Sequence, residues 1–395
     1  MQSTITRQYY KLSCLFNAGG MSIISAIYVT FLISNGLNLL EVNIVNAAYF
    51  ITLFVFEIPT GAFADIFGRK KSFIIACTLM CVSMFVYGCS STFTGFIIAE
   101  VLAAIGSTFR NGAFQAWYVD SMEHHGYKGE FTKIFGRETI IRQVGGGFGA
   151  IIGSFLTLIN PAFPWFFGGI VMAITTVYAH HIMREDYFIR SEFSWKKGLS
   201  SMKEIAISSF HYGKNHKAVQ FILIVTGLQI YVVQPINMFW QPFFNERGVS
   251  TQYLGFIFAG MMGSLAFGGH LVSKIDCKGK EKRMIIWSYI IVGIMILIVS
   301  TLSNLPAIIL LFILHEIPRG AWTPLIDSYL QKRIPSGERA TISSFCATAP
   351  HIGGAIGLGV SGLIAHHYDI TTSWIVSGIV LTLGAIMVAK KSSNN

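Results

Sequence analysis

Residues 57–71 read Glu57-Ile-Pro-Thr-Gly61-Ala-Phe-Ala-Asp65-Ile-Phe-Gly68-Arg69-Lys70-Lys71, and they join two long apolar runs, Val42 to Phe56 and Ser72 to Tyr87. Gly68 permits a tight turn where a side chain would clash. The cations that follow it favour the cytoplasmic side of a membrane. Asp65 places a carboxylate at a helix end, where it can pair with a cation or with a neighbouring helix N-terminus. The stretch therefore predicts a charged turn between two membrane-spanning helices.

The composition is that of an integral membrane protein. Of the 395 residues, 53% are hydrophobic and only 12% are charged, and the mean hydropathy is +0.57. A soluble chain carries roughly 25% charged residues. The net charge of +10 is placed in loops between apolar segments. We therefore expect the lipid bilayer, and no nucleic acid, as a partner of this chain.

Twelve segments are long and apolar enough for the roughly 20 residues that a spanning helix needs. In the first half they are 10–34, 41–63, 72–90, 93–120, 132–159 and 164–182. In the second half they are 218–243, 251–273, 284–302, 305–330, 340–365 and 371–389. The sequence thus predicts an all-α integral membrane protein with twelve transmembrane helices.

Lysine and arginine are distributed unequally between the two sets of connecting loops. One set, together with both ends of the chain, holds nearly all the basic residues outside the spans, whereas the opposite loops hold only Arg247. Loops rich in Lys and Arg stay in the cytoplasm. Both termini are therefore expected there, in a multi-pass protein of the inner (cytoplasmic) membrane.

One long connection divides the chain. It carries apolar residues at helical spacing from Trp195 to Phe210, with lysines off that stripe. This pattern is typical of an amphipathic helix on a membrane surface. We expect an N-terminal six-helix bundle over 1–183, a cytoplasmic linker over 184–217 and a C-terminal six-helix bundle over 218–395.

The two halves share short motifs at a nearly constant spacing. Asp65 and Asp120 recur as Asp276 and Asp327, about 210 residues further along the chain. Such agreement indicates an internal repeat of two helical bundles, an arrangement that many transporters use.

The Gly-x-x-x-Asp-x-x-Gly-Arg-Lys string resembles the loop between helices 2 and 3 of bacterial-type major facilitator superfamily (MFS) transporters, although Ile66 stands where that family usually has a basic residue. The resemblance implies the MFS fold, with two six-helix pseudo-repeats and a substrate site near the midplane between them. It also implies a monomer. It assigns a conformational role to the motif residues Gly61, Asp65, Gly68, Arg69 and Lys70.

Charged residues inside the spans are candidates for the substrate cavity, because each costs about 2.5–3.5 kcal/mol to insert. Arg110 and Arg319 are repeat-related and lie on helices 4 and 10, which line the central cavity in the superfamily that the chain resembles. Their guanidinium groups suit an anionic or carbonyl-rich substrate. For Arg319 the alternative is an intramembrane ion pair with Glu316, three residues before it on the same helical face.

Arg142 is a further cavity candidate, on a helix whose face also carries Glu138 and the glycines 145, 149 and 153. The glycines permit close helix contact. The alternative is that Arg142 and Glu138 form a purely structural pair four residues apart.

Polar side chains on the seventh span complete the candidate cavity. Gln234, Asn237 and Trp240 suit recognition of a moderately polar organic molecule, or alternatively hydrogen bonds between helices. The carboxylates available for proton coupling are Glu57, Glu100 and Glu316.

Enzymatic chemistry and ATP-driven transport are not expected, because the sequence shows no phosphate-binding loop, nucleophile triad or metal-ligand cluster. We expect neither a metal nor a cofactor. The leading hypothesis is a secondary active transporter for a small organic molecule, with proton-coupled export as in an efflux antiporter. The alternative is transport, in either direction, of an anionic metabolite or a polycarboxylate siderophore. A transporter-like sensor or a membrane enzyme is a third class.

Overall fold

The computed structural model describes residues 1–185, 187–188, 216–334, 342, 346 and 350–393, and the elements in this part of the chain are all helices. Ten helices among the described residues are long and apolar enough to cross a membrane, or eleven if a bent pair, Gln2–Ser25 with Tyr28–Ser34, is one span. A helix satisfies its own backbone hydrogen bonds, which the bilayer interior cannot do. The all-α prediction is confirmed.

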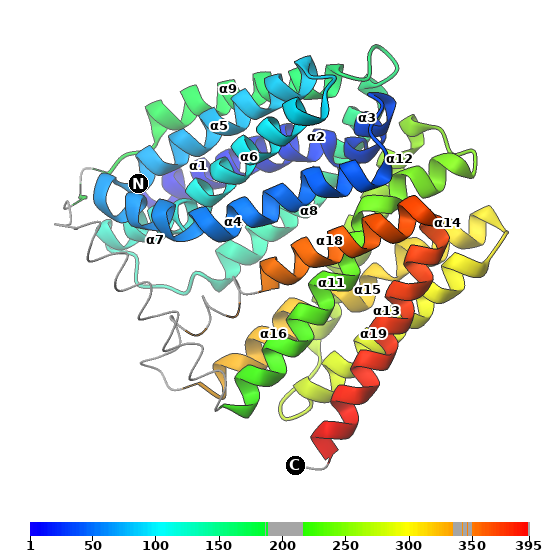
Figure 1. The fold of residues 1–395 in the computed structure, drawn as a ribbon. Helices are drawn as coiled ribbons and strands as arrows, with labels where there is room; N and C mark the ends of the chain where they lie inside the picture. The colour runs from blue at the N-terminus through cyan, green and yellow to red at the C-terminus, as the bar shows by residue number, and fades with distance from the viewer. Residues whose placement is uncertain (186, 189–215, 335–341, 343–345, 347–349, 394–395) are drawn as a thin grey trace. The chain divides into compact units, whose positions relative to one another are not determined.

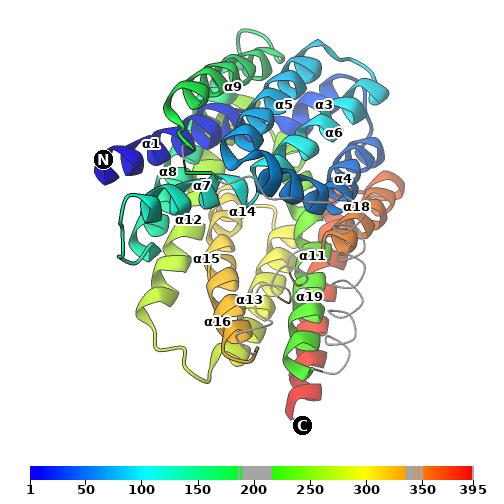
Figure 2. The same ribbon diagram turned by 90° about the vertical axis from the view of Figure 1, so that its left-hand side faces the viewer.

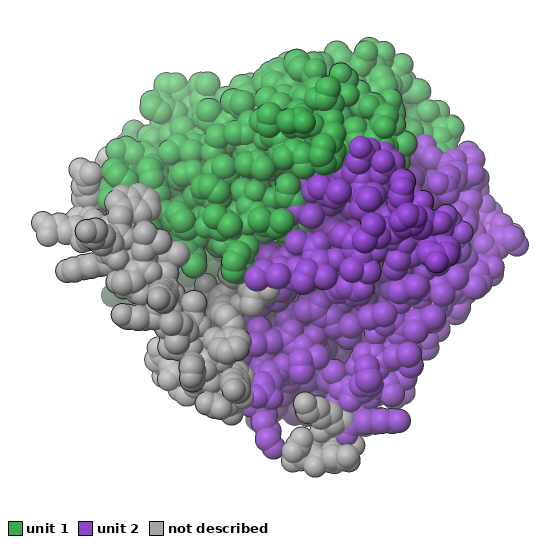
Figure 3. Space-filling model, in the orientation of Figure 1, with its two compact units in different colours: residues 1–37, 48–199, 249–259 green, residues 38–47, 200–248, 260–395 purple. Residues whose placement is uncertain are grey.

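The described residues form two compact units, which Figure 3 shows in two colours. Unit 1 contains residues 1–37, 48–199 and 249–259, and unit 2 contains 38–47, 200–248 and 260–395. The bundle and linker boundaries expected from the sequence stay a prediction. The expected amphipathic helix falls within 189–215, outside the described residues.

Unit 1 is built mainly from the first ten helical elements of the chain (Figure 1). In order they are α1 (Gln2–Cys14), the π-helix η1 (Leu15–Met21), α2 (Ser22–Ser25), α3 (Tyr28–Ser34), α4 (Leu39–Phe67), α5 (Arg69–Cys89), α6 (Phe93–Arg110), α7 (Ala113–His124), α8 (Thr132–Leu156) and α9 (Phe163–Ile182). The first turns of α4 belong to unit 2. Within unit 1, α5 lies between α6 and α9.

Unit 2 contains the later helices. They are α11 (Lys217–Glu246), α12 (Thr251–Lys274), α13 (Glu281–Thr301), α14 (Leu305–Leu314), α15 (Glu316–Gly320), α16 (Trp322–Gln331), α18 (Pro350–His367) and α19 (Ile370–Ser393). The first turns of α12 belong to unit 1. Figure 2 shows α14, α15 and α16 following one another as a broken rod beside α13.

Several expected spans are broken helices. The first is interrupted by η1 and by a bend between α2 and α3, the fourth breaks between α6 and α7, and the tenth is divided into α14, α15 and α16. The fourth span breaks at Asn111-Gly112, because Gly112 has a φ of 72°, outside the helical region. Of the expected segment 340–365, residues from Pro350 onward form the described part of α18.

Close packing of α8 against the first span shapes unit 1. A Cβ atom at Gly153 would lie 1.7 Å from the carbonyl oxygen of Ile23, and one at Gly149 would lie 2.2 Å from that of Ala18. Only glycine lets these backbones approach so closely. The contact predicted from the glycine spacing is therefore present, and it holds the charged face of α8 beside α1.

A side chain at this contact should destabilise the protein. We expect Gly153→Ala to lower the stability in detergent by about 1–3 kcal/mol, the usual cost of overpacking. Gly136→Ala on the same helix is the matched control, because a Cβ there meets no atom within 4 Å. Thermal unfolding of the two purified variants measures the difference. An equally stable Gly153→Ala protein would contradict the close-contact interpretation.

Candidate functional site

An ion-pair cluster fixes the turn between α4 and α5. The Arg69 Nη1 atom lies 2.7 Å from an Asp65 oxygen, and its Nε atom lies 3.9 Å from an oxygen of Asp120 on α7. Gly68 has a φ of 102°, a left-handed value that favours glycine. Arg69 thus connects the end of α4, the start of α5 and the end of α7.

Glu185, just after α9, joins the same cluster. One of its carboxylate oxygens accepts a hydrogen bond of 2.6 Å from the backbone N–H of Arg69. The first amides of a helix have no partner within the helix, and a carboxylate there also meets the positive end of the helix dipole. Burial raises the pKa of the Glu185 carboxyl, and the backbone donors of Arg69 and Lys70 oppose that shift. A Cβ at Gly68 would lie 2.5 Å from the other Glu185 oxygen, so this cap also requires glycine at the turn.

Unit 2 has a corresponding ion pair with the charges exchanged. Lys332, just past α16, lies 2.6 Å from the buried Glu281 at the start of α13. In unit 1 the cation is at the start of α5 and the carboxylate is on α7. In the turn before α13, Asp276 accepts a hydrogen bond of 3.1 Å from the Lys278 amide.

Arg110 ends α6 on an aromatic support. Its guanidinium carbon lies 4.7 Å from the ring centre of Phe16 in η1 and 5.9 Å from that of Phe114 on α7. Its Nε atom is buried and has no hydrogen-bond partner among the residues that the structure describes. A cation over an aromatic face is stabilised without using its N–H groups. The arrangement leaves those groups free to bind a ligand.

Glu138 and Arg142 on α8 lie near Arg110. Glu138 is buried, accepts a hydrogen bond of 2.5 Å from the Ser13 hydroxyl and lies 3.9 Å from the Nε of Arg142. Both groups are close enough to act electrostatically on Arg110. This part of unit 1 therefore holds two cations and one carboxylate, and Arg142 is the more exposed of its pair.

Unit 2 places three ionisable groups at the break between α14 and α15. The side chains of His315, Glu316 and Arg319 are 0%, 2% and 12% exposed, and Arg319 forms an ion pair with Glu316. The Nδ1 atom of His315 contacts the Phe312 carbonyl, which can only accept, so the proton is on Nδ1. Its Nε2 atom then accepts from Arg319 at 3.4 Å.

Glycines allow α15 to approach α12 closely enough to bury this cluster. A Cβ at Gly268 would lie 1.9 Å from the Ile317 carbonyl oxygen, and one at Gly320 would lie 2.1 Å from that of Leu265. Trp240 on α11 is buried and reaches the cluster through Phe312, whose ring centre is 6.4 Å from that of Trp240 and 4.7 Å from that of His315. Gln234 and Asn237 are half-buried on the same helix.

The remaining candidate carboxylates lie apart from one another in unit 1. Glu57 on α4 accepts two hydrogen bonds of 3.2 Å from the Asn111 amide. Glu100 on α6 is buried and accepts a hydrogen bond from the Tyr87 hydroxyl. Each is held by a neutral donor, whereas Glu316 faces a cation.

Sequence reasoning did not identify the partners that complete these clusters. The side chains of Ser13, Asn111 and Tyr87 hold the carboxylates of Glu138, Glu57 and Glu100, and Glu185 caps α5. Asp120 was noticed because it recurs as Asp327 in the repeat, but the repeat did not predict its pairing with Arg69. Neutral partners on distant helices leave no spacing pattern in the sequence.

Long apolar helices with buried ion pairs inside them and ion pairs at their ends are the features of a multi-pass membrane protein. The model of the Major Facilitator Superfamily matches residues 12–280 and 275–392. The chain belongs to this superfamily, and it is a secondary transporter rather than an enzyme.

Similar proteins agree with this assignment. The chain is 22% identical over 386 residues to the uncharacterized MFS-type transporter YxaM of Bacillus subtilis, covering 96% of this chain and 94% of the relative. It is 20% identical over 362 residues to multidrug resistance protein 2 of the same organism, covering 88% and 86%. The crystal structure of the nucleoside transporter NupG aligns with a TM-score of 0.78 at 15% identity, covering 98% of each chain. This likeness confirms the MFS fold.

The Arg69 cluster generates a prediction for Asp65. We expect Asp65→Asn to reduce transport severalfold while leaving membrane insertion intact, because it removes the charge that faces Arg69 at 2.7 Å. Glu123→Gln is the matched control, since Glu123 is an exposed carboxylate on α7 near Asp120. Transport in whole cells at equal expression distinguishes them. Full transport by the Asp65 variant would mean that the ion pair has no conformational role.

Proposed function

We propose that this chain is a proton-coupled exporter of a small organic molecule. The observation that carries the proposal is the buried His315–Glu316–Arg319 cluster inside a membrane span. A buried carboxylate next to a buried cation can exist as an ion pair or, after proton uptake, as a neutral acid beside a free cation. Such a site has two states that differ by one proton, as coupling requires.

The cluster suggests how proton and substrate exchange. An ionised Glu316 beside Arg319 can accept hydrogen bonds from a donor group of the substrate. When Glu316 binds a proton, it loses the charge that attracts this donor, and the substrate is released. Proton and substrate therefore compete for one carboxylate, which is the condition for antiport. The similarity to a protein named for multidrug resistance supports export.

The second candidate function is transport of an anionic metabolite or a polycarboxylate siderophore. The buried Nε of Arg110, which lacks a hydrogen-bond partner in the described part of the chain, favours it. Arg142 lies nearby and is partly exposed. Two guanidinium groups with one carboxylate leave a net positive charge for an anion.

We also propose the inner (cytoplasmic) membrane as the location, with both termini in the cytoplasm and the chain acting as a monomer. In unit 1, Arg184 lines a cavity with Met1, and Lys70 and Lys71 line another beside Glu185. Basic residues thus gather at the end of unit 1 that holds the N-terminus, which supports the cytoplasmic placement. The proposed organisation remains two bundles, 1–183 and 218–395, joined by the linker 184–217.

Proton coupling can be tested in proteoliposomes. We expect a protonophore to abolish concentrative transport and Glu316→Gln to move substrate only down its own gradient, because a neutral amide cannot exchange a proton. Glu123→Gln is again the control with the same chemical change at an exposed site. Comparing metabolites and drug tolerance between cells with and without the gene identifies the substrate to use. Concentrative transport that ignores the protonophore and follows sodium would contradict the proposal.

The two candidate substrate classes can be separated with Arg→Lys variants. Lysine keeps the charge but loses the planar fork, so Arg110→Lys should weaken binding of an anionic substrate by about 1–3 kcal/mol and affect neutral substrates little. Arg319→Lys should instead change the pH dependence for every substrate, because Arg319 is paired with Glu316. Arg7→Lys, at an exposed position, is the control. Unchanged anion affinity in Arg110→Lys would exclude transport of an anionic substrate and leave export of a neutral compound.

A further inference from the structure

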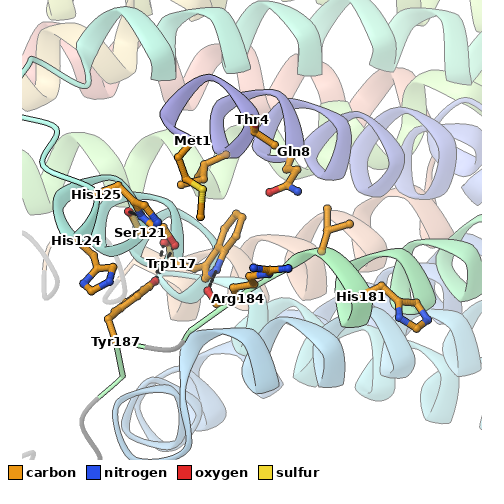
Figure 4. Close-up of a pocket in the computed structure, with 12 residues that line it drawn as sticks. Met1, Thr4, Gln8, Trp117, Ser121, His124, His125, His181, Arg184 and Tyr187 are labelled. Carbon is orange, nitrogen blue, oxygen red and sulfur yellow. Dashed lines mark hydrogen bonds between the residues drawn. The ribbon is translucent and has the colours of Figure 1, made fainter.

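A cavity of about 340 Å³ opens at the end of unit 1 that holds the N-terminus (Figure 4). Its walls come from α1, from the last turns of α7 and α9, and from the segment that follows α9. The described residues that line it include none of Arg110, Glu138 and Arg142, so the cavity is separate from the Arg110 cluster. Its volume is in the range of small-molecule sites.

Among the described residues, the lining of this cavity has one sign of charge. It includes Arg184 and three histidines and, within that part of the chain, no Asp or Glu. Glu185, next to Arg184 in the chain, instead caps α5, and Asp120, next to Ser121, faces Arg69. Consecutive residues, Arg184 and Glu185, therefore line different cavities. The cavity that Arg184 lines, which we call the chamber, is therefore cationic, and it lies beside Glu185, the acidic residue that caps α5.

Uncommitted donors face this chamber. Within the described residues, the Arg184 guanidinium, the Thr4 hydroxyl and the Gln8 amide take part in no side-chain hydrogen bond or ion pair, and Figure 4 shows Thr4 and Gln8 on α1 across from Arg184. An oxyanion accepts several hydrogen bonds at once, and guanidinium is the preferred cation for it. The same side chains would be poorly placed for a cationic ligand.

The rest of the chamber is rigid and partly apolar. Tyr187 is hydrogen-bonded to Ser121 at 2.7 Å, and the Trp117 indole donates to the Arg184 carbonyl at 3.1 Å. Burial raises the pKa of Tyr187 to about 12, so its phenol stays protonated. The His124 ring stacks on Tyr187 with centres 5.0 Å apart. The Trp117 contact holds the backbone of the exposed residue Arg184 in place, and the indole suits an organic body rather than a bare inorganic ion.

We propose that this chamber binds a small organic anion carrying a phosphate or carboxylate group, at a site separate from the transport site. Arg184 pairs with the anion, while Thr4 and Gln8 donate hydrogen bonds to it. The bound anion bridges α1 and the segment after α9, in which the next residue, Glu185, caps α5. The same chemistry is offered by a phosphorylated metabolite and by the head group of an anionic phospholipid.

The test uses the full chain, purified in an uncharged detergent and titrated calorimetrically with glycerol 3-phosphate, with citrate and with glycerol. We expect saturable binding of at least one anion and none of glycerol. Arg184→Gln should weaken that binding by about 10- to 100-fold, as for a lost hydrogen bond to a charged group. Arg7→Gln is the matched control, because it removes the same charge from α1 outside the chamber. Loss of binding in Arg184→Gln separates this site from the proposed transport site, because Arg184 lies outside the Arg110 cluster.

Two further measurements complete the test. His124→Phe keeps the stacking on Tyr187 and removes the ring nitrogens, so it should bind the anion more weakly at an unaltered melting temperature. In nanodiscs, retention of phosphatidylglycerol over phosphatidylcholine by the unmodified chain, lost in Arg184→Gln, would assign the anion to a lipid. Binding of the soluble anions alone would assign it to a metabolite. Binding that is equal in Arg184→Gln and Arg7→Gln, or the absence of binding by all three anionic probes, overturns the proposal.

Discussion

An ionised side chain inside an apolar span has to find a partner in its own bundle, because leaving it unpaired costs several kcal/mol. This requirement explains where the helices of both units come closest. Glu138 reaches Ser13 only because Gly149 and Gly153 bring α8 against the first span. Glu316 and Arg319 are buried only because Gly268 and Gly320 let α15 touch α12. The glycines are thus a condition for placing charge in the membrane, and the backbone contacts and the ion pairs depend on each other.

The requirement for a partner fixes the positions of the two paired residues more strictly than it fixes which of them is the cation. The start of α5 is joined to the end of α7 by Arg69 and Asp120, and the start of α13 is joined to the end of α16 by Glu281 and Lys332. Coulomb attraction is unchanged when the two charges are exchanged. A repeat can therefore keep its clasp while the residues that form it diverge, which explains why the motif of residues 61–70 is weak in the second half although an ion pair is present there.

Much of this fold follows from the sequence, since length and hydropathy locate spans and glycine spacing locates close contacts. The helix breaks were not predicted, although each carries a local signal. Gly112 follows Asn111 in the fourth span, and in the tenth Pro318 cannot donate a hydrogen bond to the carbonyl of Leu314, where α14 ends. Charged candidates were visible because charge is rare in spans. Their neutral partners, such as Tyr87 for Glu100 and Asn111 for Glu57, were not, because tyrosine and asparagine carry no such signal and the pairs are set by tertiary packing.

The two repeat-related arginines show how one position can serve different purposes. Arg319 forms an ion pair with Glu316, so any ligand of Arg319 must compete with a buried carboxylate. Arg110 rests on Phe16 and Phe114, and an aromatic face stabilises the cation while leaving its N–H donors uncommitted. An arginine paired with a titratable acid responds to proton binding, whereas an arginine that rests on aromatic rings responds to a bound ligand. We infer that Glu316 and Arg319 in unit 2 respond to the proton, whereas Arg110 in unit 1 serves the anionic substrate of the second candidate function.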